Sequence, residues 1–261
     1  MRSLSIASTG MLAQQLNVEV ISNNIANMNT TGYKRQRAEF QDLLYQNMNR
    51  TGAQSSDAGT VVPTGVQVGV GVRTAAVYRI NDQGNVISTD NTFDLAIQGP
   101  GFLKVQLPSG EDSYTRAGSL QLSPDGTIVT SQGYTVQPAI TIPQDAVDVT
   151  INANGEVFAK IDGQVEPQNV GQLELSIFFN EAGLEGIGDN LFLETPASGP
   201  ASDGAPGADG YGKILQGFLE TSNVNPVQEV TSLIQAQRAY EMNSKVISTS
   251  DEMMRTMSTL R

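Results

Sequence analysis

The chain has 261 residues, a formal net charge of −12 at pH 7, and no Cys, His or Trp. Without Cys or His it lacks the thiolate and imidazole ligands of most zinc, copper and iron sites, and it lacks a His general base for a nucleophilic Ser. Most familiar catalytic designs are therefore excluded, and we predict no enzyme activity, no metal ion and no cofactor.

The negative charge is concentrated in the middle of the chain. Residues 51–219 hold six Lys and Arg against nineteen Asp and Glu, whereas residues 1–50 carry +2 and residues 220–261 carry −1. Nucleic acids and anionic membranes bind basic surfaces, so the acidic middle argues against both as partners. No apolar run is long enough to span a bilayer, and the N-terminus lacks the apolar stretch of a cleavable signal peptide.

The first segment has a helical period. Steps of three and four residues from Leu4 pass through eight positions, of which only Gln14 is polar. This pattern is typical of a helix that packs along another helix. Asn-rich sequence and then a glycine predict that the helix ends between Asn27 and Gly32. The apolar seam positions are Leu4, Ala7, Met11, Val18, Ile21, Ile25 and Met28.

Short alternating stretches separated by Gly turns follow, which predicts a mainly β middle. The turn Asp162-Gly163 lies between alternating apolar residues and predicts a hairpin. Two stretches rich in small and polar residues, Asn49–Pro63 and Thr195–Gly212, are predicted to be linkers.

The last segment is a second predicted helix. Asn225 is placed as its N-cap, Pro226 as its first residue and Gln228 as the third. Its seam passes through eight positions, of which Asn243 and Ser250 are polar. The other six are Leu233, Ala236, Tyr240, Ile247, Met254 and Met257.

Two long helices that pair only with each other leave part of their apolar surface uncovered, because a helix pair has a single seam. Monomers rarely expose large apolar patches, so we predict that the seam residues contact neighbouring copies of the chain. We also expect the helices to be largely disordered in the dilute monomer and to order on assembly. An ordinary helical core layer is the alternative interpretation of the same pattern.

Two strings resemble the signatures of the bacterial flagellar basal-body rod and hook family. Residues 23–35 look like its N-terminal signature, in which an Asn-rich helix end leads into Thr-x-Gly-aromatic-Lys/Arg, and residues 219–226 and 235–245 resemble its C-terminal signature. The signature positions are Asn24, Ala26, Asn27, Thr30, Gly32, Tyr33, Lys34, Asn223, Asn225, Gln235, Arg238 and Asn243.

Within that family, residues 40–46 followed by residues 52–56 look like the extension of the distal-rod type, and residues 170–173 with 183–188 resemble its body. The resemblance places the extension, from Tyr45 to Pro63, between adjacent subunits. The proximal-rod or hook position in the same tube is the nearest alternative. The extension residues are Gly52, Ala53, Gln54, Ser55 and Ser56.

The resemblance implies an α+β, mainly β fold. Long N- and C-terminal helices would pair as a coiled-coil-like helical domain, with a β-rich body inserted between them. We expect the N-terminal helix in residues 1–32, an extended connector with the extension in 33–75, and the acidic outer body in 76–212. The return connector and C-terminal helix would occupy 213–261.

The same resemblance implies a structural subunit of a rigid hollow drive shaft in the flagellar basal body. That shaft spans the periplasm, transmits torque from motor to hook, and lets export substrates pass. Expected partners are further copies of the chain, proximal rod proteins, hook protein, the P-ring and L-ring bushing and the flagellar type III export apparatus, with export that needs no cleaved signal peptide. A secreted periplasmic glycan hydrolase is the alternative of another class, although a sugar-stacking cleft would have to form without any Trp.

Three further patterns have ordinary explanations. The Gly-rich stretch 65–71 lacks the Lys-Ser/Thr ending of a phosphate loop and is read as a strand or bend. Asp203 and Asp209 lack the ligand spacing of a calcium loop and are read as turn residues. The cluster Lys34, Arg35 and Arg37 could bind an anion, but we favour a solvated helix exit or a contact with acidic residues of a neighbouring subunit.

Overall fold

A computed structural model describes residues 2–49, 64–164 and 166–259. The chain forms two compact units. The helical unit takes the described residues of Met1–Ile25, Gln36–Tyr78 and Pro226–Arg261, and the body takes those of Ala26–Arg35 and Arg79–Asn225. Two terminal helices with a β-rich body between them confirm the α+β class.

The helical unit contains both terminal helices, α1 (Arg2–Ala26) and α2 (Pro226–Thr259). Helix α2 begins at the predicted Pro226, whose fixed φ and missing N–H suit the first helical position. Helix α1 ends one residue before the predicted window, which is within the usual scatter of helix ends. No helix of the described residues is long and apolar enough to cross a membrane.

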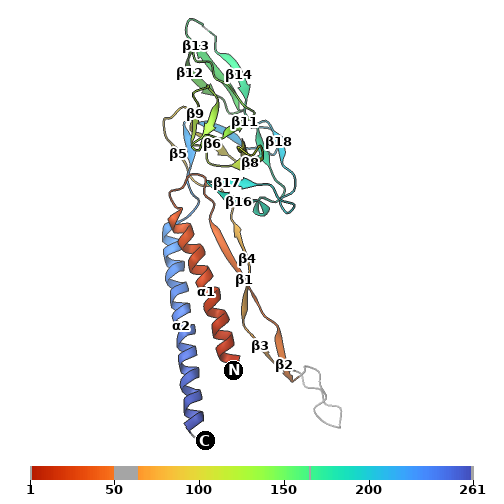
Figure 1. The fold of residues 1–261 in the computed structure, drawn as a ribbon, viewed down its shortest axis with the longest axis vertical. Helices are drawn as coiled ribbons and strands as arrows, with labels where there is room; N and C mark the ends of the chain where they lie inside the picture. The colour runs from red at the N-terminus through yellow and green to blue at the C-terminus, as the bar shows by residue number, and fades with distance from the viewer. Residues whose placement is uncertain (1, 50–63, 165, 260–261) are drawn as a thin grey trace. The chain divides into compact units, whose positions relative to one another are not determined.

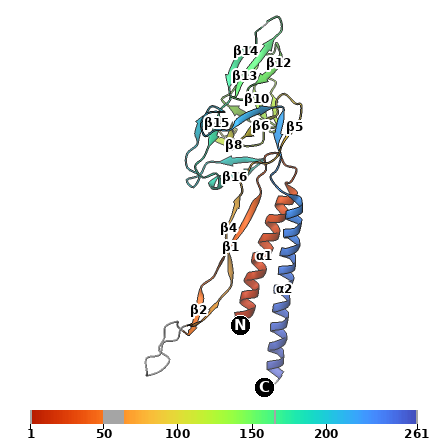
Figure 2. The same ribbon diagram turned by 180° about the vertical axis from the view of Figure 1, so that it is seen from behind.

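The two helices lie side by side in both views (Figures 1 and 2) and contact each other at three levels. The Asn24 side-chain amide donates to a Glu229 carboxylate oxygen at 3.1 Å, and the Ser250 and Ser3 hydroxyl oxygens are 3.4 Å apart. Between these levels, a Cβ added to Gly10 would come within 2.9 Å of the Asn243 side chain.

A β ribbon completes the helical unit. Strand β1 (Gln36–Asp42) pairs with β4 (Val72–Arg79), and β2 (Tyr45–Asn49) pairs antiparallel with β3 (Val66–Gly69). The Gly-rich stretch therefore contains a strand, as expected. Of the predicted linker Asn49–Pro63, residues 50–63 lie outside the described residues, and with them the extension positions Gly52, Ala53, Gln54, Ser55 and Ser56.

The body is built on one large antiparallel sheet, which has nine strands among the described residues. Its main path runs β16-β17-β8-β7-β11-β10-β9, and β15 joins β7 to β18. The strands are β7 (Phe102–Gln106), β8 (Asp112–Thr115), β9 (Leu120–Leu122), β10 (Ile128–Thr130), β11 (Thr135–Gln137), β15 (Leu175–Ile177), β16 (Glu185–Gly188), β17 (Leu191–Leu193) and β18 (Ser202–Gly204).

The body also contains smaller sheets. Strand β5 (Val86–Ser88) pairs with β20 (Phe218–Glu220), and β6 (Leu95–Gln98) pairs with β19 (Lys213–Gln216). A three-stranded antiparallel sheet joins β12 (Ala146–Ile151), β13 (Glu156–Ile161) and β14 (Gln168–Gln172), and a short 3-10 helix, η1 (Glu181–Gly183), precedes β16.

The hairpin in the body matches the sequence prediction. Strands β13 and β14 pair antiparallel on either side of Asp162-Gly163, and Gly163 has the positive φ of +84° that favours glycine. One linker prediction is wrong, because the stretch Thr195–Gly212 contains β18, which pairs with β15. Its small and polar residues resemble a linker, but strand pairing satisfies its backbone hydrogen bonds.

Aliphatic side chains from the large sheet and its neighbours form the core of the body. Leu103, Val105 and Leu175 are fully buried in it. A second cluster is aromatic and packs Phe102, Tyr114 and Phe178 edge to face. Such burial is the main stabilising term for a domain of this size.

Candidate functional site

The predicted seam residues lie mostly on covered surface. Helix α2 contacts α1 through its seam positions Asn243 and Ser250, so the seam faces the partner helix of the same chain. Ala7, Ile21 and Ala236 are buried, Leu4, Met11, Val18, Ile25, Leu233, Ile247 and Met254 are half-buried, and Met28, Tyr240 and Met257 are exposed.

A second apolar series on the helices was missed by the sequence analysis. It has an intermittent three- and four-residue spacing along α2, which was the signal that could have revealed it. On an ideal helix these positions lie outside the seam, some on its flanks and some on the far side. The outer stripe, as we name it, comprises Leu12, Val227, Val230, Ile234, Met242, Val246 and Met253, all exposed.

The two signature strings meet in the body, although they are far apart in the sequence. The Gly32 amide donates to the Glu220 carbonyl oxygen at 2.9 Å, and the Arg35 amide donates to the Asn223 side-chain oxygen at 2.7 Å. Asn223 also donates from its side-chain nitrogen to the Ile80 carbonyl at 2.8 Å. We call this meeting point of residues 30–35, 80–86 and 217–224 the crossing node.

A buried charge cluster lies at the crossing node. The Lys34 ammonium is 2.7 Å from one Glu220 carboxylate oxygen, and the Arg116 Nε is 2.6 Å from the other. The three side chains are 3%, 1% and 5% exposed in the order Lys34, Glu220, Arg116. The Gly84 amide adds a third donor to the carboxylate at 2.8 Å.

Two cations share one carboxylate here, and the pKa shifts reflect that imbalance. Burial lowers the pKa of Lys34, and the nearby charge of Arg116 lowers it further against the opposing effect of Glu220. Burial alone would raise the pKa of Glu220, but the charges of Arg116 and Lys34 and the hydrogen bonds it accepts outweigh burial. The pKa of Glu220 is therefore lowered, and its carboxylate is ionised at neutral pH.

This geometry corrects the sequence interpretation of the basic cluster. Lys34 is neither a solvated helix-exit residue nor available to a neighbouring subunit, because its ammonium is buried against Glu220 of its own chain. Arg37 does fit the solvated description, since it is exposed, 3.1 Å from Glu39, and stacks over the Tyr78 ring. A Lys followed closely by Arg35 and Arg37 gave no local sign of burial.

Gly32 is explained by the same node. Its φ of +68° is unfavourable for other residues, and a Cβ there would lie 2.9 Å from the Arg116 carbonyl carbon and oxygen. Thr30 forms the turn before it, with its amide and its hydroxyl each 3.1 Å from an Asn27 oxygen. Tyr33 accepts a backbone hydrogen bond from Asn223.

The remaining signature positions fall in or beside the helical unit. Asn24 is buried, and its side chain both accepts from the Gln36 amide at 2.9 Å and donates to the Gln36 carbonyl at 2.8 Å. It therefore fixes the start of β1 against α1 while also contacting Glu229. Asn243 packs against Gly10, and Ala26, Asn225, Gln235 and Arg238 are exposed.

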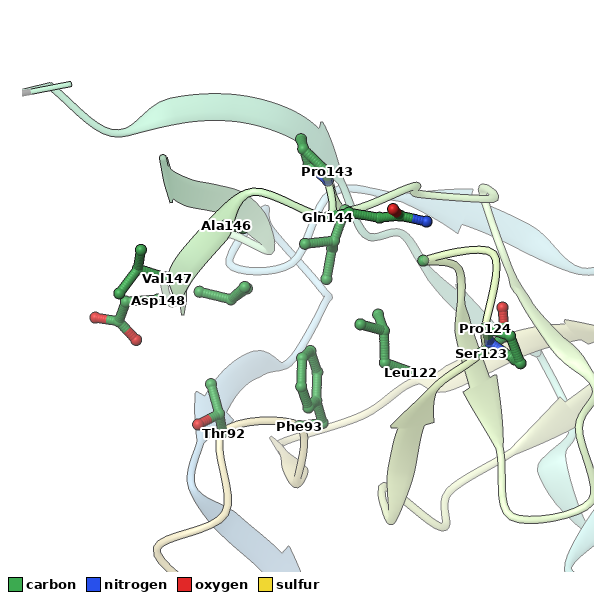
Figure 3. Close-up of a pocket in the computed structure, with 13 residues that line it drawn as sticks. Thr92, Phe93, Leu122, Ser123, Pro124, Pro143, Gln144, Ala146, Val147 and Asp148 are labelled. Atoms are coloured by element: carbon green, nitrogen blue, oxygen red, sulfur yellow. The ribbon is translucent and has the colours of Figure 1, made fainter. Parts of the chain in front are cut away.

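Figure 3 shows a pocket of about 280 Å³ on the body. Phe93, Leu122 and Pro143 are among its apolar lining residues, with Pro143 across from Phe93 and Leu122, and Asp148 lies at its edge beside Val147. Asp148 is the one ionisable group among its described lining residues. A glycosidase requires two opposed carboxyl groups, so this lining does not support the hydrolase alternative.

The described residues contain no group of three or more Asp, Glu, His or Cys placed to hold a metal ion. Asp203, considered above for calcium, instead accepts a 2.6 Å hydrogen bond from the Ser176 hydroxyl and faces Lys104. Asp209 lies in the turn 208–211, closed by a hydrogen bond from the Tyr211 amide to the Ala208 carbonyl.

Comparison with known families gives three matches along the chain. Residues 4–34 match the family described as "Flagella basal body rod protein", and residues 96–159 match "Flagellar hook protein FlgE/F/G D1 domain". Residues 215–260 match "Flagellar basal body rod FlgEFG protein C-terminal". The first and third matches contain Lys34 and Glu220, the two residues that meet in the crossing node.

Similar proteins cover the chain from end to end. A flagellar basal-body rod protein FlgG of Caulobacter vibrioides is 62% identical over all of both chains. The FlgG protein of Agrobacterium fabrum is 53% identical over 97% of both chains. The FlgG protein of Bacillus subtilis is 38% identical over 100% of this chain and 99% of its own. With such identity over its full length, and with both signatures in place, the chain belongs to the family of flagellar basal-body rod proteins.

Proposed function

We propose that the chain is a structural subunit of the flagellar distal rod. Copies polymerise into a rigid hollow shaft that transmits torque from motor to hook and lets exported proteins pass through its channel. The observation that carries this proposal is the full-length similarity to rod proteins FlgG. The same full-length similarity to rod proteins FlgG makes proximal rod and hook-type positions weaker alternatives. The chain is a structural protein and not an enzyme.

The terminal helices form the assembling part of the subunit, paired as an antiparallel, coiled-coil-like domain. Three contacts support this pairing, because the residue numbers of Asn24 and Glu229, of Gly10 and Asn243, and of Ser3 and Ser250 each add to 253. A constant sum is what two antiparallel helices in one register produce. The residues of α2 beyond position 252 then extend past the start of α1.

Interfaces between copies use the apolar surface that one chain leaves exposed. The predicted seam residues Met28, Tyr240 and Met257 contribute to it, together with the outer stripe. Monomers rarely leave so long an apolar series in water, so neighbouring copies cover it. The helices remain largely disordered in dilute monomer, which circular dichroism at low concentration would test.

Polymerisation of purified protein, followed by light scattering and electron microscopy, tests the assembly surface. Val230→Gln with Ile234→Gln removes apolar contact area from the outer stripe without touching the core of the body, and is expected to abolish polymerisation. Thr231→Gln, at an exposed polar position of the same helix, is the matched control and polymerises like the wild type. Normal rods from the double variant would contradict the proposed surface.

The extension from Tyr45 to Pro63, which includes Gly52–Ser56, bridges adjacent subunits and helps to keep the rod straight, in line with the resemblance to the distal-rod type. Deletion of residues 52–57 is expected to give curved or flexible rods that still assemble through the terminal helices. Electron micrographs of purified basal bodies would show the curvature. Straight rods from the deleted chain would argue against this role.

Further partners follow from a place in the distal rod: proximal rod proteins below, hook protein above, and the P-ring and L-ring around it. The flagellar type III export apparatus would deliver the subunit. The domain limits proposed above, 1–32, 33–75, 76–212 and 213–261, describe how each part serves that assembly. Site-specific photo-crosslinking from exposed body residues such as Phe179, which is fully exposed, would capture the ring proteins.

A peptidoglycan assay separates the rod from the hydrolase alternative. The purified chain is expected to form filaments and to release no sugar from peptidoglycan. Measurable glycan turnover by the wild type would favour the hydrolase.

A further inference from the structure

The crossing node is where the chain enters the body from α1 and where it later leaves the body toward α2. Residues 26–35 form the entry segment and residues 217–225 the exit segment, and both pack within the body. Lys34 belongs to the entry segment and Glu220 to the exit segment. Arg116 belongs to neither, because it lies in the loop between β8 and β9. One carboxylate therefore joins both segments to a third part of the body.

Backbone bonds already link the two segments, so the charges are not needed for connection alone. The Gly32 amide donates to the Glu220 carbonyl at 2.9 Å, and the Asn223 amide donates to the Tyr33 carbonyl at 3.4 Å. Strand β20 is further paired with β5 through Glu220 and Val86. The charged groups are added to a site that is already paired.

Charges are an unfavourable choice if stability is the only requirement. Taking ions out of water is costly, and well-packed apolar side chains are often as stabilising as a buried ion pair. Two cations on one carboxylate also leave an uncompensated positive charge. What charged hydrogen bonds add is directional geometry, because one arrangement of the three segments satisfies all the donors at once.

The excess positive charge is directed at the protein and not at a ligand. The Lys34 ammonium also donates to the Asp82 carbonyl at 2.8 Å. The guanidinium donates to the carbonyls of Gly101 at 2.9 Å, Gly99 at 2.7 Å and Ile97 at 3.3 Å. Both cations thus bind backbone oxygens, which ties them to the path of the chain.

We propose that Lys34, Glu220 and Arg116 form a mechanical clamp that holds the entry and exit segments to the body as one piece. The clamp rests on the proposed rod function, since a subunit that transmits torque must pass force between its terminal helices and its body. Force that enters through either helix then reaches the body through both segments together. The bonds of the node share that force and must open together.

Native-state hydrogen exchange on the full chain tests the clamp. Lys34→Met removes the charged link between the segments but leaves the Arg116–Glu220 pair balanced, so the body stays folded. Exchange of the Gly32, Arg35 and Thr221 amides is expected to rise at least about tenfold, the effect of losing one charged hydrogen bond. Core amides such as Leu103 keep their protection.

The matched control is Lys104→Met, which removes a half-exposed Lys that bridges Asp112 and Asp203 elsewhere in the body. It should leave exchange at the crossing node unchanged. Equal acceleration at the node and in the core of Lys34→Met would show a general contribution to stability and overturn the clamp. Unchanged exchange at the node would overturn it as well. Lys34→Gln keeps a hydrogen-bond donor but loses the charge, so amide exchange at the crossing node should rise less than in Lys34→Met.

Motility in media of increasing viscosity tests the mechanical role. Cells carrying Lys34→Met are expected to assemble rods, seen by electron microscopy, yet to lose swimming speed with viscosity more steeply than Lys104→Met cells. Rods that assemble and swim equally well under load, despite faster exchange at the node, would overturn the clamp alone. Failure of the wild-type chain to restore rods in cells that lack their own copy would overturn the proposed function.

Discussion

Gly32 shows how one residue can be constrained twice. Its positive φ favours glycine, and its closest neighbour is backbone that cannot rotate away. Gly110 has a similar φ of +89°, but a Cβ there would meet nothing within 4 Å. A comparison of Gly32 with Gly110 therefore separates the effect of backbone strain from the effect of a lack of space for a side chain.

Gly32→Ala is expected to lower the free energy of unfolding by about 2–5 kcal/mol, because backbone strain and overpacking add. Gly110→Ala should lower it by only about 1–2 kcal/mol, from strain alone. Urea denaturation followed by circular dichroism would measure both. Equal losses in the two variants would show that the contact with Arg116 is unimportant.

The charge of Glu220 gives the body a pH dependence. A carboxyl group whose pKa is lowered on folding stabilises the protein above its unfolded pKa, and this stabilisation is lost as pH falls through the folded pKa. The facing charged groups are Lys34 and Arg116, with Glu181 acting on Lys34. The lowered pKa of Lys34 acts in the alkaline range, where stability rises as that group loses its proton in the fold.

The wild type should therefore lose free energy of unfolding on acidification below the ordinary pKa of a glutamic acid. Glu220→Gln is expected to be less stable at neutral pH. Its free energy of unfolding should also change less steeply with pH between about pH 3 and pH 6. Urea titrations at several pH values would give the slope. A slope identical to that of the wild type would mean that Glu220 is not the group responsible.

Among the secondary-structure elements, the helix pair depends most on register. Its polar contacts, Asn24 with Glu229 and Ser3 with Ser250, would be broken by a shift of one residue. Buried polar groups are known to fix register in helix pairs at some loss of stability. A purely apolar seam would permit sliding, which a torque-transmitting shaft must resist.

Ser3→Cys with Ser250→Cys is expected to form a disulfide within one chain in assembled rods, because the two hydroxyl oxygens are 3.4 Å apart. The natural chain contains no Cys, so any disulfide is the designed one. Ser3→Cys with Ser248→Cys is the control, since Ser248 is exposed and its hydroxyl faces the Lys245 carbonyl. Non-reducing electrophoresis distinguishes them. Efficient bonding in the control, or links between chains only, would contradict the register.

For the molecule as a whole, the division into two units places a short N-terminal stretch with the body. Residues 26–35 contribute Lys34 and the backbone of Gly32 to the crossing node, although they lie far from the rest of the body in the sequence. The body should therefore depend on them.

A fragment of residues 26–225 is expected to fold alone, whereas a fragment of residues 36–225 should be less stable by about 2–4 kcal/mol. The shorter fragment leaves Glu220 without Lys34 and without the Gly32 amide. Chemical denaturation of both fragments measures the difference. Lys34→Met in the longer fragment shows how much of the loss belongs to the side chain, and equal stability of the two fragments would refute the dependence.

The sequence by itself determined the features that depend on neighbouring residues. Pro226 after Asn225 marks the start of α2, and the turn at Asp162-Gly163 predicts the β13–β14 hairpin, because capping and turn conformation act within a few residues. The two signature strings were also legible, since each is continuous. They were sufficient to indicate the rod and hook family.

The tertiary structure alone decided which surfaces and charges are covered. In the sequence, Lys34 resembles a solvated charge beside Arg35. It is buried because the fold brings Glu220, 186 residues away in the sequence, to 2.7 Å between its carboxylate oxygen and the Lys34 ammonium. Arg116 joins them from 104 residues before Glu220. Likewise, which stripe of α2 faces α1 depends on the register of two distant helices. Burial is a property of contacts between remote segments, and a linear pattern cannot contain it.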